Sequence, residues 1–290
     1  MTKDLLIVTE KKRLDKLLTE HFPEHSRTYF QYLIEEGLVL VNGEQWKKRE
    51  MPKIGDEVEI FFTLTPEIKL EPENIPLDIL YEDEHLLAIN KPAGMVVHPA
   101  PGHYTKTFVH ALLYHCKGLK NEFSDLRPGI VHRLDKDTSG VLLAAKTREA
   151  HQKLISLFCK RKIEKKYIAI CFNKPIDGLI SAPIARHPTK RKKMCIDPEK
   201  GKEAISLIKV LDHSEKLSLV EITLITGRTH QIRVHLKHLK CPILGDPVYG
   251  AGNGPLMLHA HKIIFIHPLT QKVIEIEAPI PFDFQKISAF

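Results

Sequence analysis

Cysteine is scarce in this chain of 290 residues, and its five cysteines are odd in number. Nowhere do two of them form a C-x-x-C pair. This pattern argues against a disulfide framework and against a cysteine zinc site, because both need cysteines in matched sets. The simplest interpretation is a protein that works in a reducing compartment.

Long apolar runs are also missing. The apolar run near the N-terminus ends after four residues, which is too short for the core of a secretory signal. No later stretch reaches the roughly 18 apolar residues that a membrane-spanning helix needs. We therefore expect a cytoplasmic protein that does not enter a membrane.

Hydrophobic residues are plentiful enough for a folded protein, at 43% of the chain beside 27% charged residues. A chain of this length is expected to bury about three quarters of its unfolded surface, which excludes intrinsic disorder. At roughly 100–200 residues per domain, the length predicts about two domains, for which one main domain with a small appendage would suffice.

The surplus of positive charge lies in one part of the chain. Lys and Arg outnumber Asp and Glu by 43 to 36 overall, but residues 146–202 alone carry 16 basic and 5 acidic side chains. Three basic clusters stand there, at 160–162, 165–166 and 190–193. One cluster is as well explained by solubility as by binding. Three together favour contact with phosphates, since each neutralised phosphate releases counterions.

The first part of the chain shows the pattern of a small module. Apolar residues at helical spacing predict two short helices, the second with Ser26 as its N-cap and Gly37 at its end. The Asn42-Gly43 pair predicts a hairpin, and a return segment ends in an alternating run at 58–62. We expect two helices followed by a small hairpin sheet.

This module resembles the small RNA-binding domain first described in ribosomal small-subunit protein four. The resemblance covers residues 12–62 and rests on a basic helix start, Ser-Arg at the second helix, Val-Asn-Gly and Gly-Asp-x-Val. Residues 1–62 carry 10 basic and 12 acidic side chains, so ordinary surface charge stays an alternative. By resemblance, the RNA face would consist of Arg13, Lys16, Arg27, Lys47 and Lys48.

A linker is expected after this module. Residues 63–76 contain three prolines and no apolar periodicity. The domain organisation predicted from the sequence is therefore a small domain at 1–62, a linker at 63–76 and a larger domain at 77–290.

The larger domain contains a polar loop, from His132 to Gly140, with strand-like apolar residues on both sides. Before it, residues 77–89 predict two short strands around the acidic turn 82–84. Polar residues with glycine between buried strands are typical of a functional site, although Asp and Ser also cap turns without function. Further islands of polar residues favour a site; they lie at 163–169, 226–236 and 258–268.

Taken in order, the motifs of this domain are similar to those of the RluA-type family of pseudouridine synthases. The resemblance spans 77–282, and so long an ordered set is far more specific than one short motif. The motifs are Lys-Pro-Ala-Gly from residue 91, His-Arg-Leu-Asp-x-x-Thr-Ser-Gly from 132, Lys-x-Tyr from 165, Gly-Arg-Thr-His-Gln-Ile-Arg-Val-His from 227, Gly-Asp-x-x-Tyr-Gly from 245 and Leu-His-Ala from 258.

The resemblance implies an α+β protein with the pseudouridine synthase fold. This fold is a mixed, mostly antiparallel sheet with the active site in a central cleft, here preceded by the small two-helix RNA-binding domain. The implied reaction isomerises uridine to pseudouridine in RNA, with the target base flipped out of its stack. It uses no cofactor and no metal.

The resemblance also implies roles for single residues. Asp135 would be the essential carboxylate, acting as a nucleophile or, in a competing scheme, as a base on the ribose. Tyr167 would stack on the flipped base and assist removal of the proton from carbon 5, and Arg233 would pair with the carboxylate and keep it charged. Taken alone, Tyr167 also fits a half-buried strand and Arg233 a surface strand. Substrate contacts are implied for Arg133, Ile232, Arg228 and His132.

The basic stretch from Arg186 favours ribosomal RNA as the partner. Its Arg-His-Pro-Thr-Lys-Arg sequence is similar to that of a family member that acts on the helix 69 stem-loop of 23S ribosomal RNA. We expect a monomer that binds 23S ribosomal RNA, with another 23S site or a tRNA as alternatives. The connection 251–257 is shorter than in that member. The expected contacts are Arg186, Lys190, Arg191, Lys192 and Lys193.

Two other classes of function stay open at this point. The small module and the basic stretch also fit a non-catalytic RNA-binding factor of ribosome assembly. Five of the 17 histidines could suggest a metal hydrolase, but they show neither an H-E-x-x-H motif nor an i, i+4 pair with a carboxylate. We do not expect a metal. These five are His230, His235, His238, His259 and His261.

Overall fold

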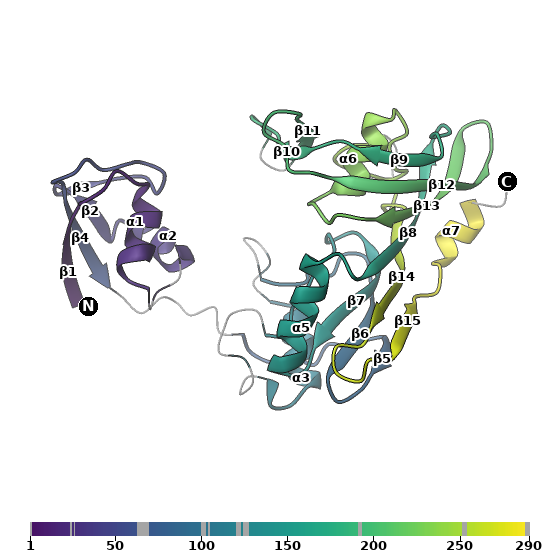
Figure 1. Cartoon of the computed structure of the whole chain (residues 1–290), viewed down its shortest axis with the longest axis horizontal. Helices are drawn as coiled ribbons and strands as arrows, with labels where there is room; N and C mark the ends of the chain where they lie inside the picture. Colours follow the sequence, from purple (N-terminus) through teal and green to yellow (C-terminus); the bar gives the residue numbers. More distant parts are fainter. Residues whose placement is uncertain are drawn as a thin grey trace. The chain divides into compact units, whose positions relative to one another are not determined.

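The chain forms two compact units, Met1–Lys69 and Leu70–Phe290, each with a hydrophobic core of its own (Figure 1). None of the described helices is long and apolar enough to cross a lipid bilayer. The computed structural model describes residues 2–23, 25, 27–62, 70–99, 103, 105–119, 123, 128–190, 193–250 and 254–287.

Unit 1 is a four-stranded antiparallel sheet with two helices, and its strand order is β1-β4-β2-β3. The predicted helices and hairpin are confirmed, and Asn42 and Gly43 both have the positive φ that this tight turn requires. Ser26 lies outside the described residues. The elements are β1 (Thr2–Ile7), α1 (Leu14–His21), α2 (Arg27–Glu35), β2 (Val39–Val41), β3 (Glu44–Gln45) and β4 (Glu57–Phe62).

Strand β1 is an element that the sequence did not predict. Its apolar residues alternate between the two faces of the sheet, because Leu6 is buried whereas Leu5 and Ile7 are about half exposed. So short an apolar run does not by itself indicate a strand rather than a helix or a loop. Its pairing partner is β4, some 50 residues away in the sequence. Tertiary pairing therefore decides this strand.

Asp15 ties the two helices of unit 1 together. Its carboxylate is fully buried and accepts hydrogen bonds from Arg13 (2.9 Å), Arg27 (2.8 Å) and Gln31 (2.8 Å). Burial raises the pKa of Asp15, but the hydrogen bonds from Arg27, Gln31 and Arg13 outweigh it, so the pKa is lowered. Two of the arginines predicted for the RNA face therefore already hold this carboxylate.

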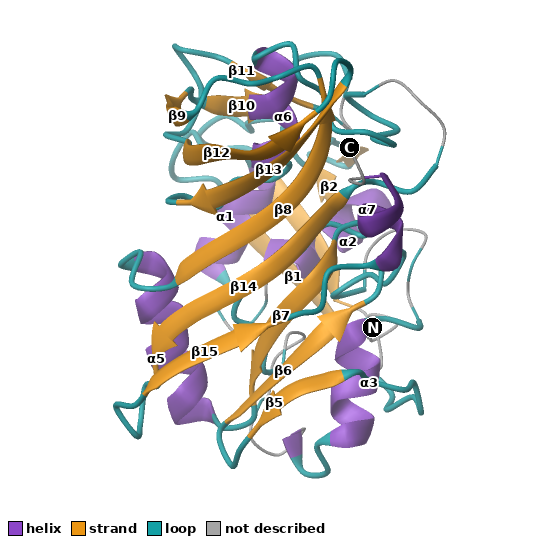
Figure 2. Cartoon of the chain, turned by 90° about the vertical axis from the view of Figure 1, so that its right-hand side faces the viewer, coloured by secondary structure: helices purple, strands orange, loops and turns teal. Residues whose placement is uncertain are grey.

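Unit 2 is built on a nine-stranded sheet, seen from its face in Figure 2. The strand order is β5-β6-β7-β14-β8-β13-β12-β9, and β15 also pairs with β14. Among the described strands of this sheet, only β7 and β14 pair in parallel, so the predicted mixed, mostly antiparallel sheet is confirmed. The strands are β5 (Ile79–Glu82), β6 (Leu86–Lys91), β7 (Ser139–Ala145), β8 (Glu164–Phe172), β9 (Gly178–Ser181), β12 (Ile205–His213), β13 (Leu217–Leu224), β14 (Leu258–Ile266) and β15 (Val273–Glu277).

Helices cover both faces of the sheet at β6. Leu87 and Ile89 belong to a core that includes α3, whereas Leu86 and Ala88 belong to a core that includes α5. Since successive side chains of a strand point to opposite faces, a strand covered on both sides is apolar throughout. The helices of this unit are α3 (Phe108–His115), α5 (Arg148–Cys159), α6 (Gln231–His238) and α7 (Phe282–Ile287).

The polar loop enters β7 through a close contact with β14. Gly140 has φ +108, and a Cβ at this position would lie 2.2 Å from the carbonyl oxygen of Ala260. Only glycine lets the two backbones approach so closely. The strand expected before the loop is absent, because within residues 128–131 only Ile130 forms a bridge, to Ala144.

A separate two-stranded hairpin, β10 (Ile184–Arg186) and β11 (Met194–Ile196), carries the basic residues near 190. Residues 70–76 of the predicted linker form neither helix nor strand and belong to unit 2, where Glu73 accepts a hydrogen bond from the amide of Lys106 (3.0 Å). The domain boundaries at 62 and 76 stay a prediction.

We expect Asp15→Asn to destabilise unit 1 by about 1–3 kcal/mol, because hydrogen bonds to a charged group are lost. A lowered pKa means that this contribution is present above the ordinary pKa of 3.8 and is lost as the pH falls through the folded value. Trp46, the single tryptophan, packs against this core and reports urea unfolding by fluorescence. Exposed Asp4→Asn is the matched control; equal midpoints for the two variants would contradict the prediction.

Candidate functional site

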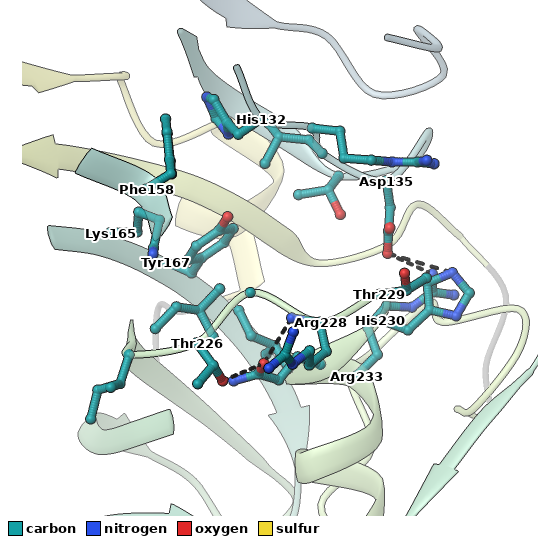
Figure 3. Close-up of a pocket in the computed structure, with 18 of the residues that line it drawn as sticks. His132, Asp135, Phe158, Lys165, Tyr167, Thr226, Arg228, Thr229, His230 and Arg233 are labelled. Atoms are coloured by element: carbon teal, nitrogen blue, oxygen red, sulfur yellow. Dashed lines mark hydrogen bonds and ion pairs between the residues drawn. The ribbon is translucent and has the colours of Figure 1, made fainter. Parts of the chain in front are cut away.

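Unit 2 contains a cavity of about 480 Å³ that segments far apart in the sequence build together (Figure 3). Its walls are the polar loop at 131–135, the end of α5, the start of β8 and the segment 224–233. The volume lies in the range of pockets that hold small organic ligands. The Asp135 loop thus opens onto a formed pocket.

Asp135 stands at one side of this pocket with one carboxylate oxygen already bound. Arg233 donates a hydrogen bond from Nη1 to Oδ2 over 3.1 Å, and Nε2 of His230 lies 3.7 Å from the same oxygen. Among the described residues, none donates a hydrogen bond to Oδ1. The side chain is 21% exposed, so the second oxygen is left for a ligand.

Arg233 is itself held by a second carboxylate, that of Asp246. Two parallel hydrogen bonds of 2.8 Å join them, and both side chains are almost fully buried. Burial lowers the pKa of Arg233, but the hydrogen bonds and charge of Asp246, together with Asp135, raise it, so the guanidinium is charged. Asp246 also accepts the amides of Val248 and Tyr249, which leaves its charge well compensated.

The segment that carries Arg233 is a buried helix, α6. The alternative of a surface strand for Arg233 is therefore wrong. Gln231 donates from its amide to Ser206 and to the carbonyl of Ile205, both at 3.0 Å, and His235 contacts Ser206 and the carbonyl of Ala182. The polar side chains of this motif point inward because each has a partner there.

Lys91 binds the backbone of the Asp135 loop through its buried ammonium group. Its ammonium group is fully buried and donates hydrogen bonds to three backbone carbonyls, those of Pro92 (2.8 Å), Met95 (3.0 Å) and Lys136 (3.0 Å). Burial lowers the pKa of Lys91 to about 8, against the charges of Asp137 and Asp135. Since Lys136 follows Asp135 directly, this lysine fixes the backbone of the loop.

Tyr167 and Lys165 of β8 lie across the pocket from Asp135 in Figure 3. Burial, with a smaller contribution from the charge of Asp135, raises the pKa of Tyr167, so the phenol keeps its proton. Burial lowers the pKa of Lys165, whose Nζ lies 5.9 Å from the centre of the Phe158 ring. This side of the pocket combines an aromatic surface with a positive charge, which suits an aromatic ring with a nearby anion.

Comparison with known proteins identifies the chain. A family model described as RNA pseudouridylate synthase matches residues 85–238, and one described as S4 domain matches residues 12–58. The chain belongs to the RNA pseudouridylate synthase family. It is an isomerase that acts on RNA, with an N-terminal S4 domain that binds RNA, and the RluA-type resemblance is confirmed.

Curated relatives match this synthase over nearly their whole length. An uncharacterized RNA pseudouridine synthase of Aquifex aeolicus is 43% identical, over 94% of this chain and 92% of that protein. The ribosomal large subunit pseudouridine synthase D of Pasteurella multocida is 40% identical, over 95% and 90%. Among solved structures, human RNA pseudouridylate synthase domain containing 4 matches with TM-score 0.58 at 28% identity, over 71% of this chain and 90% of that one.

The pocket brings together the residues that the sequence analysis expected around the synthase's substrate. Asp135, Tyr167 and Arg233 all line it, and so do the four expected substrate contacts. Arg228 donates from Nε to the carbonyl of Glu203, and His132 accepts the amide of Leu143 at 2.9 Å. These four contacts are Arg133, Ile232, Arg228 and His132.

The residues expected to contact RNA outside the pocket are more dispersed. In unit 1, Lys16 and Lys47 are exposed, whereas Lys48 pairs with Glu35, and Arg13 and Arg27 bind the buried carboxylate described above. On the hairpin of unit 2, Arg186 and Lys190 are exposed and Lys193 lies over a tyrosine ring. Arg191, Lys192 and residues 251–253 of the short connection 251–257 lie outside the described residues.

Four residues of the synthase's site received no role from the sequence. Lys91, His230, Asp246 and Tyr249 all stand in motifs that carried the resemblance, so their positions were visible but their contacts were not. Their signal was a charged or polar residue in an otherwise apolar setting, which in a folded protein needs a partner. The partners come from other segments, and only the fold reveals them.

Three of the histidines considered for a metal site contact other side chains of the protein. His230 contacts Tyr249, His235 contacts Ser206 and His259 contacts Ser139. Each interaction occupies one ring nitrogen of its histidine with a protein group.

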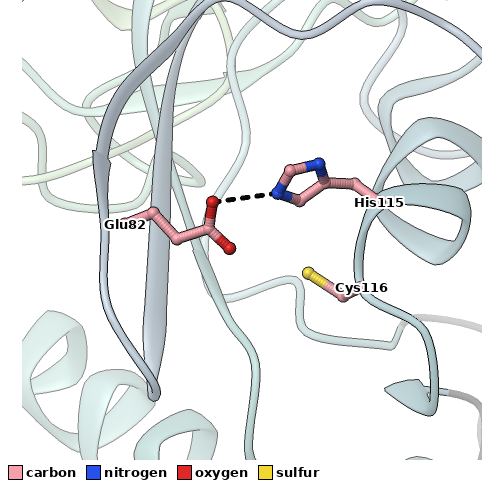
Figure 4. A group of neighbouring side chains, drawn as sticks. All are labelled: Glu82, His115 and Cys116. Atoms are coloured by element: carbon pink, nitrogen blue, oxygen red, sulfur yellow. Dashed lines mark hydrogen bonds and ion pairs between the residues drawn. The ribbon is translucent and has the colours of Figure 1, made fainter.

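Elsewhere in the described chain, Glu82, His115 and Cys116 bring potential ligand atoms within 4.8 Å of one another (Figure 4). Glu82 is already bound to Lys146 (2.7 Å) and His115 (2.9 Å), and burial raises the pKa of the Cys116 thiol to about 11. A paired carboxylate and a protonated thiol are poor metal ligands. We assign no site to this cluster.

We expect Lys91→Met to slow pseudouridine formation at least about tenfold and to destabilise unit 2 by about 2 kcal/mol, since three buried carbonyls lose their donor. RNA affinity should change less than about twofold, because the pocket walls and basic clusters remain. Single-turnover rates and a binding titration with the same RNA measure the two effects. Lys262→Met, which removes the partner of Glu275 and Glu277, is the control and should keep the wild-type rate. Normal turnover by Lys91→Met would show that the loop holds itself.

Proposed function

We propose that this enzyme converts uridine to pseudouridine in 23S ribosomal RNA, in the helix 69 region. The observation that carries the chemistry is the Asp135–Arg233 pair at the edge of a cavity large enough for a flipped nucleotide. The target is supported by the relatives named ribosomal large subunit pseudouridine synthase D, among them those of Pasteurella multocida and Escherichia coli at 40% and 38% identity over 95% of the chain. The basic stretch from Arg186 to Lys193 supports the same target.

In the proposed reaction, Oδ1 of Asp135 attacks carbon 1′ of the flipped uridine. The bond from carbon 1′ to nitrogen 1 breaks, and uracil leaves with the electron pair. Arg233 holds Oδ2 throughout, so the carboxylate keeps its orientation while its other oxygen reacts. Paired with the charged Arg233, the carboxylate reacts as an anion and needs no activating base.

Tyr167 supports the second half of the reaction. The freed uracil turns on the tyrosine face until carbon 5 meets carbon 1′, and the new bond releases Asp135 as a carboxylate. The proton then lost from carbon 5 is matched by one gained at nitrogen 1, so the product is an isomer of the substrate. Once Asp135 is covalently bound it has no charge, so one of the two causes that raise the pKa of Tyr167 is gone at that stage. Stacking of a base on such a ring contributes about 1–3 kcal/mol.

The remaining lining residues fit contacts with the RNA around the flipped base. Arg133 is exposed beside Asp135 and can follow the backbone, while Ile232 offers an apolar contact on the buried side. His132 lines the pocket as a neutral side chain, because burial lowers its pKa to about 3. The S4 domain is proposed to hold a neighbouring part of the same RNA.

We expect Asp135→Asn to abolish isomerisation, with a loss of at least about 10³-fold, because an amide oxygen is a far weaker nucleophile. RNA binding should stay within about threefold of the wild type, since Asn keeps the shape. Asp137→Asn, two residues along the same loop, is the matched control. Wild-type rates in Asp135→Asn would refute the proposed chemistry.

The target is tested by mapping pseudouridines across ribosomal and transfer RNA in cells that lack the protein. We expect the loss of modification in the helix 69 region of 23S ribosomal RNA. Wild-type protein should restore it, and Asp135→Asn should not. Loss confined to a tRNA or to another 23S site would overturn the proposed target and leave the chemistry standing.

Replacing Lys190, Arg191, Lys192 and Lys193 by alanine should flatten the salt dependence of RNA binding. Each lost phosphate contact lowers the slope of log K against log salt by about 0.7–0.9. A variant with the same charge change outside the basic clusters is the control and should keep the wild-type slope; its positions are Lys209, Lys216, Lys240 and Lys272. Identical slopes for the two variants would mean that the 190–193 cluster only aids solubility.

A further inference from the structure

Tyr249 occupies a position between the hairpin β10–β11 and the carboxylate site. Its ring is 8% exposed and lies under the Arg233 guanidinium, 5.2 Å from Cζ to the ring centre. Its hydroxyl oxygen accepts a hydrogen bond of 2.7 Å from the backbone amide of Met194, the first residue of β11. Lys193, the residue before Met194, has its Nζ 5.9 Å from the centre of the same ring.

The other partner of this hydroxyl is His230. The oxygen of Tyr249 lies 2.8 Å from Nδ1, and the opposite nitrogen, Nε2, faces Oδ2 of Asp135 at 3.7 Å. His230 has φ +56 directly before α6, a conformation that costs energy for any residue except glycine. Its ring is thus held between a phenol and the reactive carboxylate.

The hydrogen bonds decide which nitrogen of His230 carries the proton. Among the described residues, Nδ1 is the acceptor within reach of the Tyr249 proton, because the amide of Met194 is itself a donor. Burial lowers the pKa of His230; Asp135 and Asp246 raise it, and Arg233 and Arg133 lower it, with a net decrease. A neutral ring that accepts at Nδ1 has its proton on Nε2. That N–H points at Asp135.

We propose that Tyr249 is a positioning residue that fixes His230 in the Nε2–H tautomer and connects the basic hairpin to the catalytic carboxylate. With Arg233, His230 then supplies a second donor to Oδ2 and leaves Oδ1 as the attacking oxygen. The 3.7 Å separation is longer than a hydrogen bond, as is common in a site without substrate, and closes when RNA occupies the pocket. The inference rests on the proposed role of Asp135.

The connection has a consequence for how RNA is recognised. Met194, whose amide donates to the Tyr249 hydroxyl, directly follows Lys193, and Lys193 is a proposed RNA contact. When RNA holds the hairpin, it holds the Tyr249 hydroxyl and with it the His230 ring. Correct engagement of the basic hairpin is therefore coupled to the orientation of Asp135 within the same unit.

Tyr249→Phe tests the proposal, because it removes the hydroxyl and keeps the ring under Arg233. Both hydrogen bonds of the hydroxyl are lost, and the loss of the one to His230 is expected to slow the single-turnover rate about tenfold, with RNA affinity within about twofold of the wild type. Tyr81→Phe is the matched control: its hydroxyl donates to Asp83 (2.6 Å), and it should keep the wild-type rate. An unchanged rate in Tyr249→Phe would overturn the proposal.

A spectroscopic measurement separates positioning from mere packing. In protein with labelled histidine, the ring-nitrogen chemical shifts of His230, assigned by their loss in His230→Gln, should show an unprotonated Nδ1 in the wild type. In Tyr249→Phe, they should show a mixture of tautomers. An unchanged pattern in Tyr249→Phe, or a protonated Nδ1 in the wild type, would overturn the proposal. This readout needs no substrate, so it stands even if the proposed RNA target or the role of Asp135 fails.

The two residues should also act as one unit. Gln at position 230 offers an amide donor whose orientation does not depend on a tautomer. Tyr249→Phe should therefore slow the His230→Gln enzyme less than about twofold, against tenfold in the wild type. Equal effects in both backgrounds would show that Tyr249 acts independently of His230.

Discussion

The buried ion pair between Arg233 and Asp246 is the interaction on which the rest of the site depends. Burying two charged groups costs free energy unless hydrogen bonds compensate each of them. Here the hydrogen bonds that do so also join separate segments of the chain. Asp246 closes the turn after it through two amides, and Arg233 spans from that turn to Asp135. Charged groups of a helix, a turn and the Asp135 loop thereby meet at one place.

This arrangement explains why so polar a motif as Gln231 to His235 is buried. Gln231 and His235 hold α6 against β12. The backbone that carries Arg233 is therefore fixed, and the direction of its side chain is restricted. On the opposite side, Lys91 fixes the backbone beside Asp135. The carboxylate of Asp135 is thus placed by two buried cations: Arg233 binds its side chain, and Lys91 binds the main chain of the next residue.

Local signals in the sequence predicted much of the fold. The Asn42-Gly43 turn, the helices of unit 1 and the strands around the turn at 82–84 depend on neighbours in the chain, and the structure has them. β1 depends on a distant partner and was not predicted. The helical form of the Arg233 segment was not predicted either, because its buried face includes polar side chains. The expected association of Asp135 with Arg233 came from family resemblance, because their 98-residue separation has no local signal.

The place of β14 in the sheet has a consequence for biosynthesis. β7 follows the Asp135 loop and β8 carries Tyr167, yet the two strands are joined in the sheet through β14, which comes later in the chain than both. Contacts so distant in sequence form late in folding. A growing chain that has reached only residue 250 can therefore contain a complete S4 domain while the two walls of the pocket in unit 2 still lack their common strand.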